Sequence, residues 1–299
     1  MLSTEVGGLK LDNPLILASG ILGNNVYLLK RVADAGAGAL TTKTILPEPT
    51  KGYGNPVIVE LPFGLLNAMG LPNPGVKEFS RELKEARSII DVPVIASAGG
   101  GTPEEVAYVA GMLADAGADA IEINASCPHV KAHGLELGST PEDLFLLVRE
   151  VRNAVKVPLF VKLTPMTNNI SALGEAAMKA GANGLTAINT VKAMIIDVEA
   201  MTPILSNKFG GLSGPAIRPI AVRAVYELAG LGDVIGTGGV ESWRDAAEML
   251  LAGAKAVGIG TAIYRRGLSV FKEILDGLTR YLEEKGLTVK ELIGRGRNC

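Results

Sequence analysis

One short pattern recurs four times in this chain and constrains its fold more than any other feature. It is an Ala-Gly-Ala step at the end of a helical stretch, and it runs directly into residues of strand character. The glycine is a typical helix C-cap, and one helix-to-strand joint used repeatedly indicates a chain that alternates helices with parallel strands. The four copies occupy residues 34–40, 115–121, 179–185 and 251–257.

The rest of the chain completes an eightfold alternation. Hydrophobic strands are predicted within the four repeats and at 15–18, 94–96, 159–163 and 234–236, and a hairpin with a glycine turn is predicted at 6–11. A length of 299 residues suits one α/β barrel. We therefore predict a (β/α)8 TIM barrel as a single domain over residues 1–299, with the N-terminal β-hairpin closing its bottom. Helices are predicted at 27–35, 73–88, 103–116, 140–155, 170–180, 215–229, 242–251, 268–284 and 288–292.

Two predicted connections are longer than the few residues usual between strand and helix, namely 43–72 and 189–214. Both follow predicted barrel strands, and so does the polar loop that begins at Asn124. We expect these extended loops to lie over the C-terminal face of the barrel, where such folds carry their chemistry.

Composition excludes several classes of function. The net charge of −2 gives no basic surface for nucleic acid. No apolar run is long enough for a membrane span, and the first residues lack the features of a signal peptide. Two cysteines provide neither a disulfide framework nor the four thiolates of an iron–sulfur cluster. We expect a cytoplasmic enzyme, with any iron–sulfur chemistry on a partner.

Cys127 is the candidate base. It lies in the polar stretch Asn124-Ala125-Ser126-Cys127-Pro128-His129, directly after a predicted strand, and not among apolar residues as a core cysteine would. A thiol can accept a proton at mildly alkaline pH. His129 and His133 lie nearby, but the spacing lacks the further ligands of a zinc site, so base catalysis is the favoured interpretation.

Lysines and glycines follow or occupy other predicted strands. Lys43 and Lys162 stand in otherwise apolar strands, where a cation needs an anionic partner unless its stem reaches solvent. A Schiff-base role for Lys162 and a role beside a flavin ring are both open. Gly238-Gly239 and Gly260-Thr261 follow the last two strands, where barrels of this type bind phosphate. Turn glycines are the alternative. Amides at Asn67, Asn124 and Asn189, with Thr190, suit a ligand rich in carbonyl and N–H groups, such as a pyrimidine.

Over nearly its whole length the sequence resembles the dihydroorotate dehydrogenases. The resemblance rests on the residues of the following stretches: 17–20 (LASG), 42–44 (TKT), 67–75 (NAMGLPNPG), 124–128 (NASCP), 161–165 (VKLTP), 189–190 (NT), 210–214 (GGLSG) and 238–239 (GG). Cysteine at the base position is similar to the class 1 enzymes, and Val130-Lys131 is most like the catalytic subunit of class 1B.

The resemblance implies oxidation of (S)-dihydroorotate to orotate in pyrimidine biosynthesis, with Cys127 as base and Lys162 steadying the reduced flavin. It also implies a partner subunit that carries FAD and a 2Fe–2S cluster and passes electrons to NAD, in a heterotetramer of two plus two subunits. FMN is expected to contact Ser19, Lys43, Thr44, Asn124, Lys162, Ile188, Gly214, Gly238, Gly239, Gly260 and Thr261. The substrate is expected to contact Lys43, Asn67, Met69, Gly70, Leu71, Asn124, Asn189 and Thr190.

Other interpretations stay open. Ser97 stands where relatives often carry an asparagine that faces the flavin, and His129 where asparagine is common, so neither is assigned a role. A Cys-Pro-His also occurs in dihydropyrimidine dehydrogenases, which are one alternative, and a fumarate-using class 1A enzyme is another. A lyase that uses Lys162 as a Schiff base and a flavin-binding scaffold without turnover are the alternatives from other functional classes.

Overall fold

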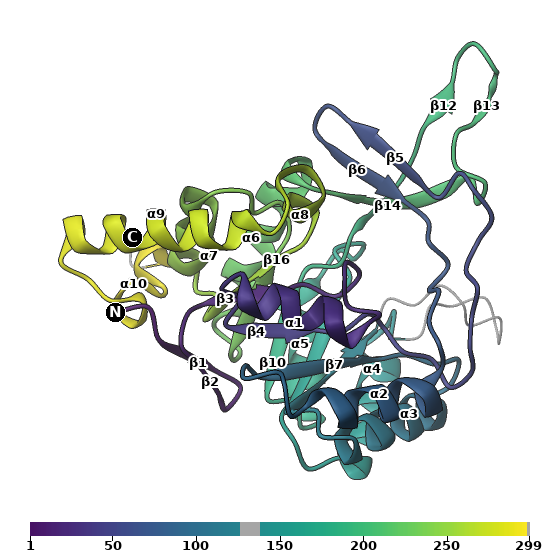
Figure 1. Cartoon of the computed structure of the whole chain (residues 1–299), viewed down its shortest axis with the longest axis horizontal. Coiled ribbons are helices and arrows are strands. Elements are labelled where there is room, and N and C mark those ends of the chain that lie inside the picture. The colour runs from purple at the N-terminus through teal and green to yellow at the C-terminus, as the bar shows by residue number, and fades with distance from the viewer. Residues whose placement is uncertain (126–137, 298–299) are drawn as a thin grey trace.

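The computed structural model describes residues 1–125 and 138–297, and these form a closed barrel of eight parallel strands. The strands follow one another around the barrel in the order β10-β15-β16-β3-β4-β7-β8-β9, with helices on the outside (Figure 1). The predicted barrel and its eight strands are therefore confirmed. The strands are β3 (Leu15–Leu17), β4 (Ala39–Thr41), β7 (Val94–Ala98), β8 (Ala120–Asn124), β9 (Leu159–Leu163), β10 (Gly184–Ala187), β15 (Val234–Thr237) and β16 (Ala256–Ile259).

The predicted helices are present, with ends shifted by a few residues. The helix predicted at 215–229 divides into a 3-10 turn, η1 (Pro215–Ile217), followed by α6, and the short helix α8 was not predicted. In the part of the chain that is described, no helix is both long and apolar enough to cross a membrane. The helices are α1 (Val26–Asp34), α2 (Val76–Ala86), α3 (Pro103–Asp115), α4 (Pro141–Ala154), α5 (Ile170–Lys179), α6 (Arg218–Leu228), α7 (Trp243–Ala252), α8 (Thr261–Arg266), α9 (Ser269–Lys285) and α10 (Val289–Leu292).

The four sequence repeats share one hydrogen-bonded turn. Their glycines, Gly36, Gly117, Gly181 and Gly253, have φ angles between 97° and 114°. In every copy the glycine N–H donates to the carbonyl three residues back, and the next alanine N–H donates to the carbonyl five residues back. This is the Schellman pattern, which ends a helix and turns the chain toward the next strand. The repeat thus encodes the same joint four times.

The N-terminal hairpin closes one end of the barrel, as predicted. Its strands β1 (Thr4–Val6) and β2 (Leu9–Leu11) bury Val6, Leu9 and Leu11 in a cluster with Phe160 and the apolar residues that begin the barrel strands. A Cβ at Gly7, where φ is 56°, would lie 2.6 Å from the Phe160 ring, so glycine permits this close approach. The bottom layer of the barrel interior is therefore apolar.

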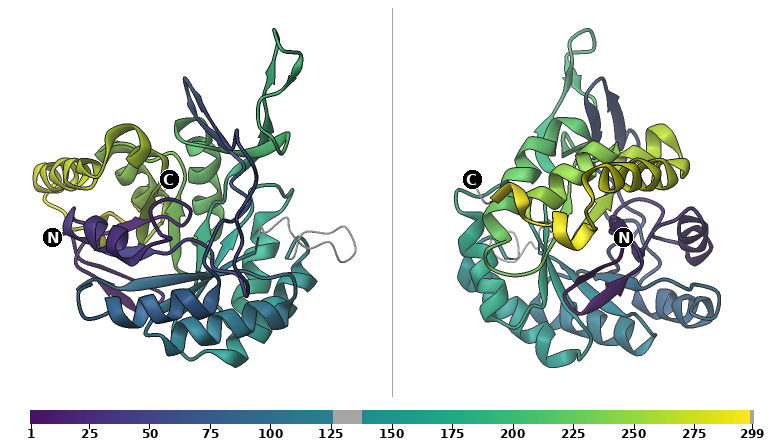
Figure 2. Two further views of the ribbon diagram at one scale, coloured as in Figure 1. Left: turned by 45° about the vertical axis from the view of Figure 1, so that its right-hand side comes forward. Right: turned by 90° about the vertical axis from the view of Figure 1, so that its left-hand side faces the viewer.

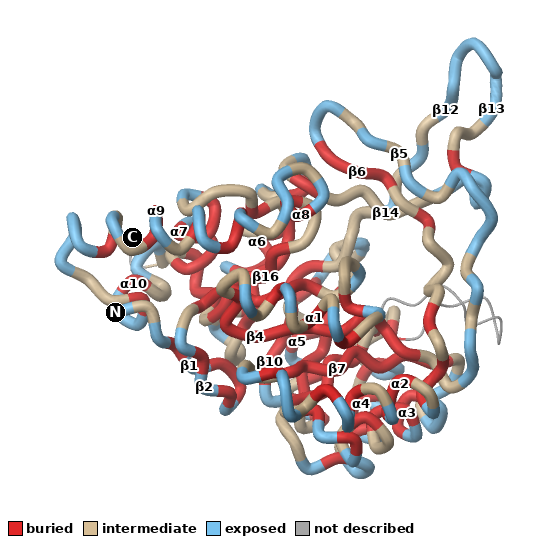
Figure 3. The backbone as a smooth tube through the Cα atoms, viewed as in Figure 1, coloured by how far each residue is buried: buried red, intermediate tan, exposed pale blue. Residues whose placement is uncertain are grey.

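The two long connections do not remain loops. They supply a four-stranded antiparallel sheet in the order β11-β14-β6-β5, which projects beside the barrel (Figures 1 and 2). The small hairpin β12 (Ile196–Asp197) and β13 (Thr202–Pro203) extends farther and is largely exposed, whereas the barrel strands are buried (Figure 3). The sheet strands are β5 (Ile58–Leu61), β6 (Gly64–Asn67), β11 (Val191–Met194) and β14 (Phe209–Ser213).

Candidate active site

A chain of polar side chains crosses the C-terminal ends of four barrel strands. Thr44 Oγ1 lies 3.0 Å from Ser97 Oγ and accepts a hydrogen bond of 3.0 Å from Asn124 Nδ2. Asn189 Nδ2 donates to Asn124 Oδ1 at 3.4 Å, and the Asn189 side chain also accepts from the Thr190 N–H at 2.8 Å. The ends of β7 and β8 and the segments after β4 and β10 are thereby joined. The structure brings together four of the residues predicted from sequence: Thr44, Asn124, Asn189 and Thr190.

Ser97 has a role in this chain that the sequence did not reveal. Its side chain is fully buried, and its N–H donates to Thr42 Oγ1 at 2.9 Å while its hydroxyl meets Thr44. Ser97 therefore supports Thr44, which in turn holds the Asn124 amide. A serine pointing into a barrel at a strand end is the signal that could have indicated this support.

Two lysines are buried at the same end of the barrel. Lys43 is 7% exposed and Lys162 is 8% exposed, and no carboxylate of the described residues lies within 4.0 Å of either ammonium. Burial lowers the pKa of Lys43, because a charged amine loses hydration there. Buried cations without a nearby ion pair are suited to hold an anionic or electron-rich ligand.

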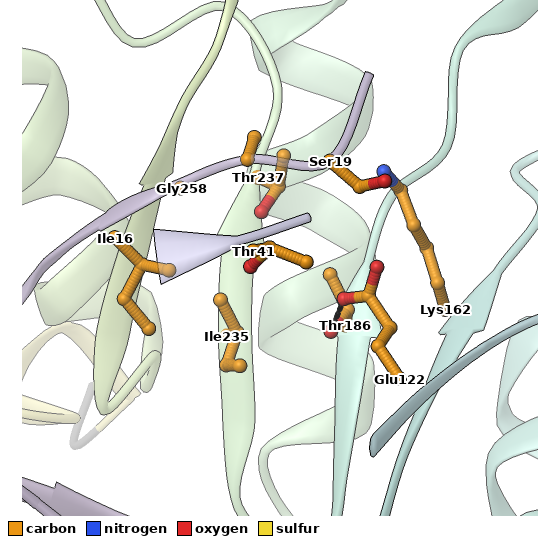
Figure 4. A pocket seen from close by; sticks show the side chains of 10 residues that line it. Ile16, Ser19, Thr41, Glu122, Lys162, Thr186, Ile235, Thr237 and Gly258 are labelled. Carbon is orange, nitrogen blue, oxygen red and sulfur yellow. Dashed lines mark hydrogen bonds between the residues drawn. The ribbon is translucent and has the colours of Figure 1, made fainter. Parts of the chain in front are cut away.

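A carboxyl group lies beneath the lysines, and it was missed from the sequence. Glu122 is 2% exposed, and its Oε2 accepts a hydrogen bond of 2.8 Å from Thr186 Oγ1. It faces a narrow cavity inside the barrel (Figure 4). The volume of this cavity, about 10 Å³, is about the smallest that can hold one water molecule. The available signal was one charged residue within the strand segment Ala120–Asn124, which is otherwise apolar up to its last residue. The polar residues that line the cavity are Ser19, Thr41, Glu122, Lys162, Thr186 and Thr237.

A second group of predicted residues meets on the side of β15 and β16. Gly214 and Gly239 have φ angles of 92° and 73°, and a Cβ on Gly239 would lie 2.7 Å from the Gly214 carbonyl oxygen and 2.7 Å from Arg218 Cβ. Thr261, the first residue of α8, donates from its hydroxyl to Ser213 Oγ at 2.8 Å. These backbones approach so closely that Gly239 has no room for a side chain, as a phosphate-binding turn requires.

The remaining residues of that predicted group lie beside it. Gly238 has a φ of 138°, and a Cβ there would lie 2.8 Å from Ala221 and 3.6 Å from Ile188. The N–H of buried Ile188 donates to the Thr237 carbonyl at 2.7 Å. Gly260 is the N-cap of α8, and a Cβ there would meet Ala18 only at an ordinary contact distance of 3.6 Å.

The predicted substrate residues of the 67–71 segment divide into two sets. Asn67 Nδ2 donates to the Gly211 carbonyl at 3.3 Å, and Thr190 packs against Gly211, so Asn67 connects to the amide chain. Met69 and Gly70 instead pack toward the chain before β5, where the Tyr53 N–H donates to the Met69 carbonyl at 3.1 Å, and the Leu71 carbonyl accepts from Asn73 Nδ2 at 2.8 Å. The described contacts do not join these three residues to the polar chain.

Cys127, the predicted base, lies outside the described residues, as do His129 and His133. Its position in the sequence is three residues after Asn124, the last residue of β8. The described surroundings supply donors and acceptors for a planar polar ligand, buried positive charge and a glycine-lined turn. That set of groups fits binding of a phosphate-bearing cofactor and of a small anionic substrate.

Comparison with known proteins gives one consistent result. The family model described as dihydroorotate dehydrogenase matches residues 1–282. A protein of Pyrococcus abyssi named "Dihydroorotate dehydrogenase B (NAD(+)), catalytic subunit" is 54% identical, with 98% of each chain covered. Proteins with the same name from Methanocella arvoryzae and Methanocaldococcus jannaschii are 48% and 46% identical, each over 98% of this chain and 97% of the relative.

Proposed function

Because this chain belongs to the dihydroorotate dehydrogenase family, we propose that it is the catalytic subunit of an NAD-linked enzyme that oxidises (S)-dihydroorotate to orotate in pyrimidine biosynthesis. The observation that carries the proposal is the 54% identity over 98% of both chains to a catalytic subunit of that name. The hydrogen-bonded amides and buried lysines at the strand ends support it, since they suit a small polar anion. The resemblance to the family and to its class 1B catalytic subunits is thereby confirmed.

Membership of the family implies a flavin, and we assign FMN to a single domain that spans residues 1–299. The residues present fit such a group: Lys43 and Lys162 are buried cations without an ion pair in the described part, and the turn at Gly214 and Gly239 has no room for a side chain. When bound, FMN supplies a hydride acceptor. The residues that hold it are Ser19, Lys43, Thr44, Asn124, Lys162, Ile188, Gly214, Gly238, Gly239, Gly260 and Thr261.

Substrate recognition falls to the amide chain and to Lys43. The amides of Asn67, Asn124 and Asn189 offer both donors and acceptors to the carbonyl and N–H groups of the pyrimidine ring. The ammonium of Lys43 balances the substrate carboxylate, which offsets the cost of burying either charge alone. Met69, Gly70, Leu71 and Thr190 complete the proposed substrate contacts.

Two residues carry the chemistry in this proposal. Cys127 Sγ accepts the proton from C5 of dihydroorotate while the hydride leaves C6. The thiolate form of Cys127 is the form that can accept this proton. The Lys162 ammonium supplies positive charge where negative charge develops at the flavin. Lys162 is suited to this role because it is buried at the end of β9, where a cation acts through a less screened field.

The name "catalytic subunit" of the relatives implies a partner subunit. We propose that the partner carries FAD and a 2Fe–2S cluster, and that two copies of each subunit assemble. The two cysteines of this chain support placing the cluster on the partner, because a cluster needs about four thiolate ligands. The same cysteine content, without a disulfide framework, supports a cytoplasmic location.

The decisive experiment is an absorbance spectrum of the purified chain followed by anaerobic titration with dihydroorotate. We expect a flavin spectrum that bleaches on addition. Dihydrouracil is the matched control, because it is the same ring without the carboxylate, and it should leave the spectrum unchanged. Bleaching by dihydrouracil alone would indicate a dihydropyrimidine dehydrogenase. A protein that stays colourless after FMN is added back would overturn the cofactor, and borohydride trapping would then test a lyase that uses Lys162.

A further inference from the structure

One layer above the apolar bottom, the side chains inside the barrel change from apolar to polar. The inward-facing residues there are hydroxyls, one carboxyl and one ammonium, contributed by β4, β8, β9, β10 and β15. Glu122 is the acid of this layer, and among the described residues that line the cavity Lys162 is the other charged group. A buried carboxyl is costly, so its retention at this depth calls for a physical role.

The carboxyl of Glu122 is only half satisfied. Its Oε2 accepts from Thr186, whereas its Oε1 is buried and has no hydrogen-bond partner among the described residues. Figure 4 shows this second oxygen directed along the cavity toward the end where Ser19 and the Lys162 ammonium lie. No direct ion pair within 4.0 Å joins Glu122 to Lys162, and the cavity that both residues line has about the least volume that one water molecule needs.

We propose that Glu122 is a positioning residue for Lys162: from inside the barrel it supplies the counter-charge and, through a water molecule in the cavity, the hydrogen-bond acceptor that fix the Lys162 ammonium at the barrel mouth. The inference rests on the proposed function only in so far as Lys162 faces a flavin there. The pairing itself follows from the cavity, the free carboxyl oxygen and the burial of both groups.

The pairing makes the charge at this site depend on pH. Burial raises the pKa of Glu122, while the Lys162 ammonium and the Thr186 hydroxyl oppose that rise. The other groups that face the carboxyl are the uncharged hydroxyls of Thr41 and Thr237 and, toward the mouth, that of Ser19. In acid solution Glu122 is neutral and the positive charge of Lys162 is unbalanced. In alkaline solution the carboxylate balances it, and a bound flavin then accepts electrons less readily.

The first test needs neither flavin nor substrate. Infrared difference spectra of the flavin-free chain, compared with those of Glu122→Gln, are recorded at a series of pH values from acid to alkaline, because burial raises the pKa of Glu122 above its usual value. Glu122→Gln keeps the shape and the acceptor for Thr186 but not the charge. We expect a protonated-carboxyl band in the wild type that the substitution removes and that fades as the pH rises.

Three further variants separate coupling from structure. Lys162→Met and Thr186→Val should each move the midpoint of the Glu122 titration to higher pH, because each removes a group that favours the carboxylate. Thr41→Val, which changes another wall of the same cavity, should leave the midpoint unchanged. If no band is lost in Glu122→Gln, or if Lys162→Met does not move the midpoint, the proposal is overturned.

The second test measures the flavin midpoint potential of the FMN-loaded chain against pH. At alkaline pH, Glu122→Gln should favour the reduced flavin at least tenfold over the wild type, which is about 30 mV for a two-electron couple. At acid pH the two potentials should coincide. Equal potentials throughout would overturn the proposal. If dihydroorotate fails to bleach the wild type while the infrared results hold, it is the proposed function that fails, and the Glu122–Lys162 pairing stands.

Discussion

Substituting Gly239 with alanine tests how tightly the glycine-lined turn is built. Its φ of 73° lies in the left-handed region, which costs a residue with a Cβ about 1–2 kcal/mol. The new Cβ would lie 2.7 Å from both Arg218 Cβ and the Gly214 carbonyl oxygen, and such overpacking costs about 1–3 kcal/mol more. We therefore expect Gly239→Ala to lower the free energy of unfolding by about 2–5 kcal/mol, a large part of the 5–15 kcal/mol typical of a domain.

Gly286→Ala is the matched control. Gly286 has a similar φ of 63° at the end of α9, but nothing lies within 4 Å of a Cβ built there. This variant should lose only the backbone term, about 1–2 kcal/mol. Urea unfolding of both flavin-free variants measures the difference, and quenching of FMN fluorescence measures cofactor affinity. FMN should bind at least tenfold more weakly to Gly239→Ala alone. Equal losses of stability, with unchanged FMN affinity in both, would refute the reasoning.

Three other substitutions give independent checks. Cys127→Ala should retain FMN but lose turnover by about 10²–10⁴-fold, the usual contribution of a general base; near-normal turnover at every pH would remove Cys127 from that role. Burial lowers the pKa of Lys43, so the folded chain binds fewer protons than the unfolded chain, and its stability should increase as the pH rises toward the usual lysine pKa of 10.5. In urea unfolding, Lys43→Met should abolish this increase of stability with pH and should stabilise the ligand-free chain at neutral pH. It should also weaken orotate binding by about tenfold or more, because a charge-assisted hydrogen bond is lost. Phe160→Ala should cost about 3–5 kcal/mol in the same assay, because the ring fills the bottom layer against Gly7 and Gly184; a loss below 1 kcal/mol would contradict that packing.

The barrel was predictable from the sequence because each of its helix-to-strand joints is encoded by residues that are adjacent in the chain. Each repeat encodes a complete joint in about seven residues, and the glycine φ angles and paired hydrogen bonds at Gly36 and its three counterparts are the structural form of that pattern. The hairpin at residues 4–11 is equally local. Prediction of such elements needs no knowledge of distant partners.

The projecting sheet was not predictable, because it depends on pairing between distant segments. Leu66 pairs with Leu212 across two separate insertions, and the strand β14 contains Gly210-Gly211, a pair that argues against a strand when read alone. The structure explains these glycines, since a Cβ on Gly210 would lie 2.6 Å from the Asn67 carbonyl oxygen, and one on Gly211 would collide with Thr190. Glycine is present here for close approach and not for a turn.

The candidate site was predicted in part. Residues at or just beyond strand ends, such as Asn124 and Thr44, were identified because polar groups that follow an apolar strand are conspicuous in the sequence. The supporting residues Ser97 and Glu122 were not, since a residue inside a strand reveals its direction only when the barrel register is known. Each acts through a neighbour, Ser97 through Thr44 and Glu122 through Lys162. Such indirect roles leave little trace in sequence spacing.

The apolar hairpin across the bottom of the barrel limits the routes by which substrate can enter and product can leave. Because Val6, Leu9 and Leu11 pack against Phe160, the barrel is closed at its N-terminal end and open only at its C-terminal end. Dihydroorotate must therefore enter at the C-terminal face of the barrel, and orotate must leave by the same face before the next molecule arrives. In the proposed function electrons are under no such restriction, because they can pass through the barrel wall to the proposed partner subunit while the open end of the barrel is still occupied.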